Sequence, residues 1–190
     1  MPHASLVDAS VTVPFENNKL LLGRWQAADD AWRKRDVRYG VATREQIAGK
    51  SGLGIFQAMI AGEIPAPPIT QTLDFMLVEA EHGRVVFQGR PSFAHYNPMG
   101  TVHGGWSATL LDSALGCAVQ SVLPAGKSYT TAELKVNIVR PLTDKVPFVR
   151  AESRIIHAGG RMATADATPT GSDGKLYAHG STTCFIFDQT

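Results

Sequence analysis

The chain has 190 residues, of which 44% are hydrophobic and 18% are charged, and its formal net charge is +1. This composition is that of an ordinary globular protein with one substantial core. Without a run of Lys and Arg interleaved with aromatic residues, the near-neutral charge gives no support to nucleic-acid binding.

The cysteines and the first residues of the sequence indicate the cellular compartment. Cys117 and Cys184 lie in apolar segments and have no CxxC or metal-ligand spacing. The segment from Met1 to Val13 has neither the basic start nor the apolar stretch of a signal peptide. We therefore expect a cytoplasmic protein with reduced thiols, no bound metal and no membrane association.

Residues 1–68 are expected to form a helical extension. Behind Asn18, which could cap a helix, apolar side chains recur at helical spacing: Leu21, Trp25, Ala28 and Trp32. Thr43 to Gln46 fits a capping box, and Ser51 opens a further apolar run that Gly62 can end. The segment Pro65 to Pro68 then predicts a short, stiff connector without helix.

From Ile69 the hydrophobic period changes to two. Thr72 to Glu79 and Arg84 to Gly89 are expected to be strands that flank a hairpin turn, Glu81 to Gly83. Tyr96 to Gly100 then predicts a turn, because Asn and Gly tolerate positive φ.

The segment from Trp106 to Val122 predicts the central element of the domain. It is apolar on every helical face, as in a buried helix, and its length of roughly 25 Å is too short to span a bilayer. Its single ionisable side chain is Asp112, and an unpaired carboxylate there would lose hydration worth several kcal/mol. Asp112 is therefore the residue that most needs a functional explanation.

Two glycines stand where this helix begins. His103 is followed by Gly104 and Gly105, which leave the first backbone N–H groups uncovered by any Cβ. Such groups carry the positive end of the helix dipole and can hold an oxyanion or a carbonyl oxygen. Asp112 lies about two and a half turns further on, so it either serves another site or meets this one through a second copy of the chain.

After the helix, four alternating segments predict strands: Thr131 to Val139, Phe148 to His157, Arg161 to Thr168 and Lys175 to Phe187. In the first, Ala132, Leu134, Val136 and Ile138 would share one side of a half-buried strand. Hairpin, helix and then hairpin-connected strands indicate an α+β fold with one antiparallel sheet, which we assign to residues 69–190.

These motifs resemble a known family. Asn97-x-x-Gly100-x-x-His103-Gly104-Gly105, then Asp112 in an apolar helix, then a Thr-bearing strand ending in Arg140-Pro141, resembles the hotdog-fold acyl-CoA thioesterases of the PaaI-like family. The resemblance covers about residues 70 to 187. It implies a long helix wrapped by an antiparallel sheet, and a homodimer or dimer of dimers with active sites at the dimer interface.

The resemblance also implies roles for individual residues. Asp112 would be the general base or nucleophile, and the Gly104 N–H with Asn97 would hold the thioester carbonyl. His103 would orient that end of the site, and Thr131 would stand where the family often has a Ser or Thr that positions the attacking water. No separate cofactor is implied, since coenzyme A is part of the substrate, and its phosphates would need cations such as Arg154, His157 and Arg161.

Each of these residues also has a structural interpretation. Asp112 could cap or break the helix, His103 could bond a backbone carbonyl, Asn97 could serve only its turn, and Thr131 is an ordinary strand former. The three cations could simply lie on a solvated surface. Other chemistries have less support: Ser107 lacks the glycine pattern of a nucleophile elbow, and burial should make the Cys117 thiol unreactive.

We therefore predict a thioester hydrolase that cleaves acyl-CoA to a free acid and CoA. Two alternatives stay open: a hotdog hydratase or dehydratase acting on the acyl chain, and a non-catalytic module that binds acyl-CoA. A buried acid favours catalysis, because a pure binder gains nothing from it.

Overall fold

The computed structural model describes residues 15–189, so the expectation for Met1 to Val13 lies outside the described residues. Four helices come first: α1 (Phe15–Arg33), α2 (Arg44–Ile47), α3 (Gly52–Ala61) and α4 (Pro68–Thr72). They are followed by β1 (Phe75–Glu81), β2 (Arg84–Gly89), the short 3-10 helix η1 (Phe93–His95) and the long helix α5 (Gly104–Ser121). The chain closes with β3 (Lys127–Ile138), β4 (Val149–Ala158), β5 (Met162–Gly171) and β6 (Ala178–Asp188).

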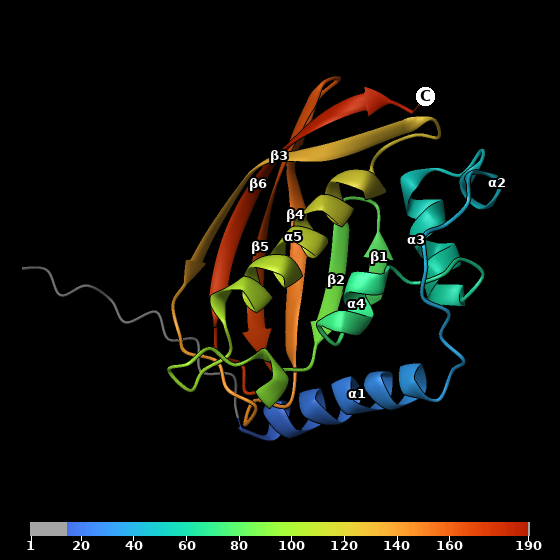
Figure 1. Ribbon diagram of the computed structural model, residues 1–190. Helices are drawn as coiled ribbons and strands as arrows, with labels where there is room; N and C mark the ends of the chain where they lie inside the picture. Colours follow the sequence, from blue (N-terminus) through green and yellow to red (C-terminus); the bar gives the residue numbers. More distant parts are fainter. Residues whose placement is uncertain (1–14, 190) are drawn as a thin grey trace, which may run out of the picture.

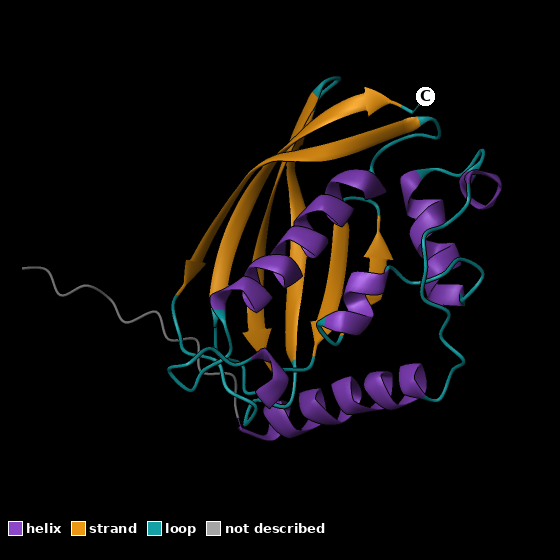
Figure 2. Cartoon of the chain, viewed as in Figure 1, coloured by secondary structure: helices purple, strands orange, loops and turns teal. Residues whose placement is uncertain are grey.

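One antiparallel sheet wraps the central helix, as Figures 1 and 2 show, and the predicted α+β hotdog architecture is confirmed. The strand order is β1-β2-β4-β5-β6-β3, so β1 and β3 are the two edges. Helix α5 lies along the inner face, where Leu110, Leu111 and Leu115 have no exposed surface. The helix that the sequence predicted as apolar all round is thus the core of the fold.

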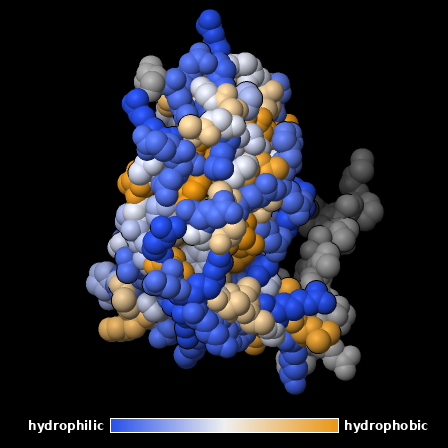
Figure 3. Space-filling view, turned by 90° about the vertical axis from the view of Figure 1, so that its right-hand side faces the viewer, coloured by the Kyte–Doolittle hydropathy of each residue, from blue (hydrophilic) through white to orange (hydrophobic). Residues whose placement is uncertain are grey.

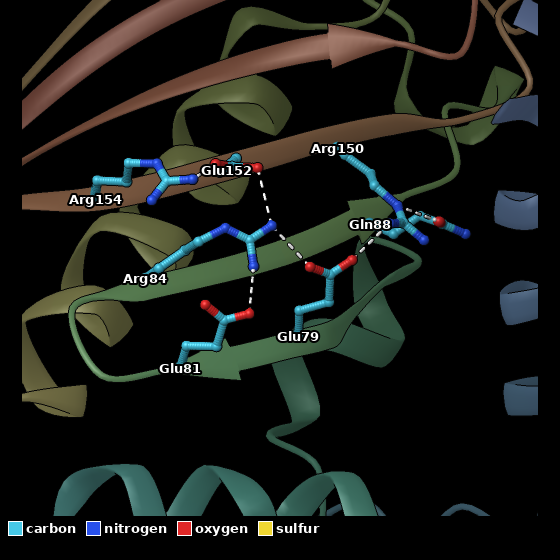
Figure 4. A network of polar contacts seen from close by, with 7 residues as sticks. All are labelled: Glu79, Glu81, Arg84, Gln88, Arg150, Glu152 and Arg154. Atoms are coloured by element: carbon cyan, nitrogen blue, oxygen red, sulfur yellow. Dashed lines mark hydrogen bonds and ion pairs between the residues drawn. The ribbon is translucent and has the colours of Figure 1, made fainter. Parts of the chain in front are cut away.

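Helix α1 covers the other face of the same sheet. The Gln88 amide of β2 donates to the Trp25 carbonyl of α1 (3.0 Å), and the Arg150 guanidinium of β4 lies 4.8 Å from the centre of the Trp25 ring. These residues alternate with inward-facing ones, so α1 packs on the outer face of the sheet. Beyond them, Figure 4 shows an ion-pair network on β1, β2 and β4 that links Glu79, Glu81, Arg84, Glu152 and Arg154.

The surface of the molecule mixes polar and apolar side chains. In the face that Figure 3 shows, hydrophilic residues predominate and hydrophobic ones lie in small separate groups between them. Among the described helices, none combines the length and apolar character needed to cross a bilayer.

Most of the predicted capping and turn motifs are present in the structure. The capping box of Thr43 and Gln46 opens α2, the Ser51 hydroxyl accepts from the Gly54 N–H at the start of α3, and Gly62 ends α3 in the left-handed region (φ 83°). Glu81 pairs with Arg84, so the hairpin loop is the two residues between them.

Several predicted boundaries are wrong. Asn18 lies inside α1, where its amide donates to the Asp173 carbonyl (3.3 Å), so it does not cap the helix. Pro68 opens α4, because proline is well suited to the first helical position, and this places Thr72 in a helix instead of a strand. Strand β3 begins at Lys127, and β6 begins only at Ala178.

The alternation predicted for β3 holds only in part. A register shift between Thr131 and Glu133 interrupts it. Leu134 and Val136 pack against the core, whereas Ile138 is 53% exposed. The strand is therefore less buried in a single chain than its apolar pattern predicts.

The packing of α3 on α5 yields a first prediction. The Gly52 N–H donates to the Leu123 carbonyl (3.0 Å), and a Cβ on Gly52 would overlap the Gln120 carbonyl. Gly52→Ala should destabilise the fold by about 1–3 kcal/mol, because backbone atoms cannot move aside cheaply. Urea unfolding followed by circular dichroism measures this change.

Gly54→Ala is the matched control in the same helix. Its Cβ would meet the Ser51 hydroxyl at 3.4 Å and otherwise only the Lys50 side chain, so this variant should gain up to about 1 kcal/mol from helix propensity. Equal stability of the two variants would contradict the close approach of α3 to α5.

Candidate functional site

The start of α5 is organised by a turn centred on Asn97. The Asn97 side-chain oxygen accepts from the backbone N–H groups of Met99 (2.9 Å) and Thr101 (3.2 Å), and its amide donates to the Thr101 hydroxyl (3.0 Å). Gly100 adopts the positive φ of 82° that this turn requires. The predicted turn is present, and the Asn97 carboxamide is engaged in holding it.

His103 caps α5. Its Nδ1 accepts from the Gly105 N–H (2.8 Å), and its backbone N–H donates to the His95 carbonyl (2.8 Å). With Nδ1 as an acceptor, the neutral ring carries its proton on Nε2, which belongs to an exposed side chain. His103 therefore presents a hydrogen-bond donor beside the helix start.

The backbone N–H of Gly104 is left open by this arrangement. Among the described residues it has no hydrogen-bond partner, and Gly104 lines a cleft of about 330 Å³. The cleft is lined by residues of the turn, of α5, of the end of β3 and of the segment after it, including Asn97, Thr101, Gly104, Ser107, Ile138 and Arg140. A donor at a helix N-terminus, beside a cleft, can polarise a carbonyl oxygen or hold an oxyanion.

Asp112 lies elsewhere, at the seam between α5 and the edge strand β3. Its Oδ1 accepts a hydrogen bond from the Thr131 hydroxyl (3.1 Å), so the structure brings these two predicted residues together. Asp112 is half-buried, not enclosed as the apolar helix suggested, and it has a partner. A carboxylate held in this way keeps one oxygen for other chemistry.

A single chain does not join the two groups of residues. Gly104 and Asp112 are eight positions apart along α5, which is about 12 Å of helix, and Asp112 does not line the cleft at Gly104. Asn97, His103 and Gly104 thus form one candidate half-site, and Asp112 with Thr131 forms a second one.

The three cations predicted for the CoA phosphates are spread over the β4–β5 hairpin. Arg154, His157 and Arg161 are all exposed, and no described contact joins them. Arg154 pairs with Glu152 (2.7 Å), as Figure 4 shows, so part of its charge is already balanced. The structure does not gather these residues into one anion site.

Two side chains that the sequence analysis did not select support the helix start. The Trp106 indole N–H donates to the Leu73 carbonyl (2.8 Å), and the His95 ring stacks on Trp106 with ring centres 5.8 Å apart. Burial lowers the pKa of His95, so this ring is neutral over most of the physiological range. An apolar Trp directly after two glycines was the only sequence signal for this support.

The thiols beside the seam lead to a second prediction. Burial raises the pKa of the Cys117 thiol to about 12, and the negative charge of the nearby Asp112 is the smaller second cause. This direction agrees with the expected low reactivity. At pH 8 the folded protein should therefore react with iodoacetamide roughly 1000-fold more slowly at Cys117 than an unfolded chain does. The rate should keep rising about tenfold per pH unit beyond about pH 9, where a free thiol levels off.

Intact-mass spectrometry followed by peptide mapping measures this rate. Protein unfolded in urea is the control, because both of its cysteines should react quickly. Rapid modification of folded Cys117 at pH 8 would mean that the seam between α5 and β3 opens readily.

Residues 99–178 match the family model of the thioesterase superfamily. A candidate esterase from Halobacterium salinarum is 34% identical in an alignment of length 84, and the match covers 37% of this chain and 54% of that protein. The chain thus matches about half the length of this relative.

Two solved structures with the same fold are also similar in sequence. A candidate thioesterase from Ralstonia eutropha, described as related to phenylacetic acid degradation, has a TM-score of 0.63 and 27% identity, and covers 68% of this chain and 98% of its own. A mutant of the phenylacetic acid degradation protein PaaI from Thermus thermophilus has a TM-score of 0.56 and 26% identity, over 62% and 97% of the two chains. The predicted resemblance to PaaI-like hotdog thioesterases is confirmed.

Proposed function

We propose that this hotdog protein, similar to thioesterases in sequence and fold, is an acyl-CoA thioesterase whose active sites are shared between two copies of the chain. The observation that carries the proposal is the hydrogen bond between Thr131 and Asp112, which places a carboxylate and a hydroxyl together on a half-buried surface. An acid with this support on the central helix suits general-base or nucleophilic catalysis.

The two half-sites suggest how the thioester is held. The carbonyl oxygen would accept from the open Gly104 N–H of one protomer, beside the His103 ring and the turn held by Asn97. Each such donor typically contributes about 3 kcal/mol to stabilising a developing oxyanion. Asp112 of the other protomer would either deprotonate a water held by Thr131 or attack the carbonyl itself. On the first route the proton that Asp112 takes from water passes to the departing thiolate, so the products are the free acid and CoA. On the second route the C–S bond breaks as an acyl anhydride forms on Asp112, and water then hydrolyses this anhydride and supplies the proton that the CoA thiolate takes up.

A second copy of the chain provides the geometry that one chain lacks. Two antiparallel α5 helices about a two-fold axis would bring the Gly104 end of one beside the Asp112 region of the other, and would create two equivalent sites. Strand β3, which carries Thr131, is a 12-residue edge strand whose outer edge is unpaired within the described chain. Long open edges favour pairing with another strand, which supports a dimer through this side.

Replacement of Asp112 gives the third prediction. Asp112→Asn keeps the shape of the side chain and removes its basicity and nucleophilicity, so turnover of acyl-CoA should fall at least about 100-fold while binding survives. A thiol-release assay over short, medium, long and aryl acyl-CoAs measures turnover, and calorimetry measures binding. Asp30→Asn, an exposed acid of α1, is the control and should keep wild-type activity.

The outcomes separate the functions considered. Near wild-type activity in Asp112→Asn would rule out the catalytic role of this residue. Tight binding of acyl-CoA by wild-type protein, with no thiol released from any substrate, would favour a binding module. Hydration of an enoyl-CoA without thiol release would favour a hydratase.

Subunit exchange gives the fourth prediction. Gly104→Val should crowd the carbonyl site and press on the Ile138 side chain, whose Cδ1 would lie 2.8 Å from the new Cβ, so this variant should also be inactive. When it is mixed with Asp112→Asn, each mixed dimer has one doubly altered site and one intact site. Random exchange should then restore about a quarter of wild-type activity.

Mixed dimers can be verified with two affinity tags, and each parent alone serves as the control. Folded parents that form mixed dimers without any recovery of activity would contradict the shared site, and Asp112 would then have to act within its own chain.

A further inference from the structure

Tyr129 shares the seam with Asp112. It lies on β3 two residues before Thr131, so the two side chains point to the same face, toward α5. The Tyr129 hydroxyl lies over Gly116, which is one helical turn beyond Asp112. A Cβ at residue 116 would overlap this hydroxyl and would lie 2.7 Å and 2.8 Å from the ring atoms Cε2 and Cζ. The tyrosine therefore occupies the space that the missing side chain of Gly116 leaves.

The surroundings of this ring are apolar. Tyr129 pairs with Ile186 across the sheet, and Thr131 pairs with Cys184, which has no exposed surface. Burial, followed by the proximity of Cys117, Cys184 and Asp112, raises the pKa of Tyr129, so its phenol stays protonated at neutral pH. No described residue bonds its hydroxyl, so the ring acts here chiefly as a wall.

The direction of the acyl group follows from the same geometry. With the thioester carbonyl beside Asp112, the polar CoA would extend toward solvent. The apolar acyl group would extend along α5 toward its C-terminus, where Leu115, Ala118 and Val119 have no exposed surface. In that direction the Tyr129 ring on Gly116 closes the path after about one turn, or roughly 5.4 Å.

We propose that Tyr129, seated on Gly116, closes the acyl pocket and restricts this enzyme to short acyl groups. This inference rests on the proposed thioesterase function. It assigns a specificity-determining role to a residue that takes no part in the chemistry.

The test is a chain-length profile of kcat/KM with acetyl-, butanoyl-, octanoyl- and dodecanoyl-CoA. Wild-type protein should prefer the short substrates. Tyr129→Ala should raise the ratio of octanoyl-CoA to butanoyl-CoA at least about 10-fold, since a few buried methylenes are worth that much discrimination. Tyr129→Phe keeps the ring volume and should keep the wild-type profile.

Gly116→Ala supplies a readout that does not depend on activity. In wild-type protein its Cβ meets the Tyr129 ring and should lower the Tm, whereas in the Tyr129→Ala background the same substitution should not. The double variant should also lose part of the gain on octanoyl-CoA, because the new methyl group refills the pocket. If the Tyr129→Ala variant does not fold, Tyr129→Leu takes its place in both experiments.

The outcomes of these experiments distinguish a failure of the inference about Tyr129 from a failure of the proposed thioesterase function. A wild-type preference for dodecanoyl-CoA, or an unchanged profile in folded Tyr129→Ala, would overturn the inference while leaving the thioesterase function standing. A shift in Tyr129→Phe as well would assign selectivity to the hydroxyl and overturn the role of ring volume. Failure of wild-type protein to release thiol from any acyl-CoA would overturn the proposed function itself.

Discussion

The contact between the leucines of α5 and the small residues that β4, β5 and β6 place on the inner face of the sheet is the interaction on which the other features depend. On the inner face, Ala151, Ala163, Ala165 and Ala178 have no exposed surface. At Gly180 a Cβ would lie 2.6 Å from the Lys135 carbonyl oxygen and 3.3 Å from a methyl group of Leu111, so no room is left for a larger residue. The large side chains of the helix fit against the small side chains of the sheet, so the curved sheet can wrap closely around one helix.

The packing of α5 against the sheet determines which positions of α5 can carry a charged residue. Positions that face the middle strands are enclosed, and a carboxylate there would lose its hydration without compensation. Asp112 instead faces β3, the edge strand, where it is half-buried and accepts a hydrogen bond from Thr131. The seam thus combines an apolar side with an unpaired strand edge in the described chain, which suits the proposed chemistry on an acyl thioester.

The structural features that the sequence predicts well are helix ends and turns, whose geometry depends on a few neighbouring residues. The capping box at Thr43, the cap at Ser51 and the left-handed Gly62 depend on local backbone bonds, and each has the expected geometry. Contacts between distant segments were not readable. Asn18 bonds the Asp173 carbonyl, 155 residues away, and Tyr129 lies outside the predicted alternation, which begins at Thr131, whereas β3 begins at Lys127. Only the family resemblance assigns Asp112 and Thr131 to one site, since no spacing rule joins a helix to the next strand, and their hydrogen bond is seen only in the structure.

The N-terminal extension is physically continuous with the site, although the Ralstonia structure covers only 68% of this chain. Arg33 of α1 bonds Asp29 (2.7 Å) and Asp74 (2.7 Å), and this holds Asp74 at the unusual φ of 50°. The preceding carbonyl, that of Leu73, accepts from the Trp106 indole in the first turn of α5. Helix α1 therefore stabilises the segment that fixes the orientation of Trp106, and through it the helix start where Gly104 leaves its N–H open.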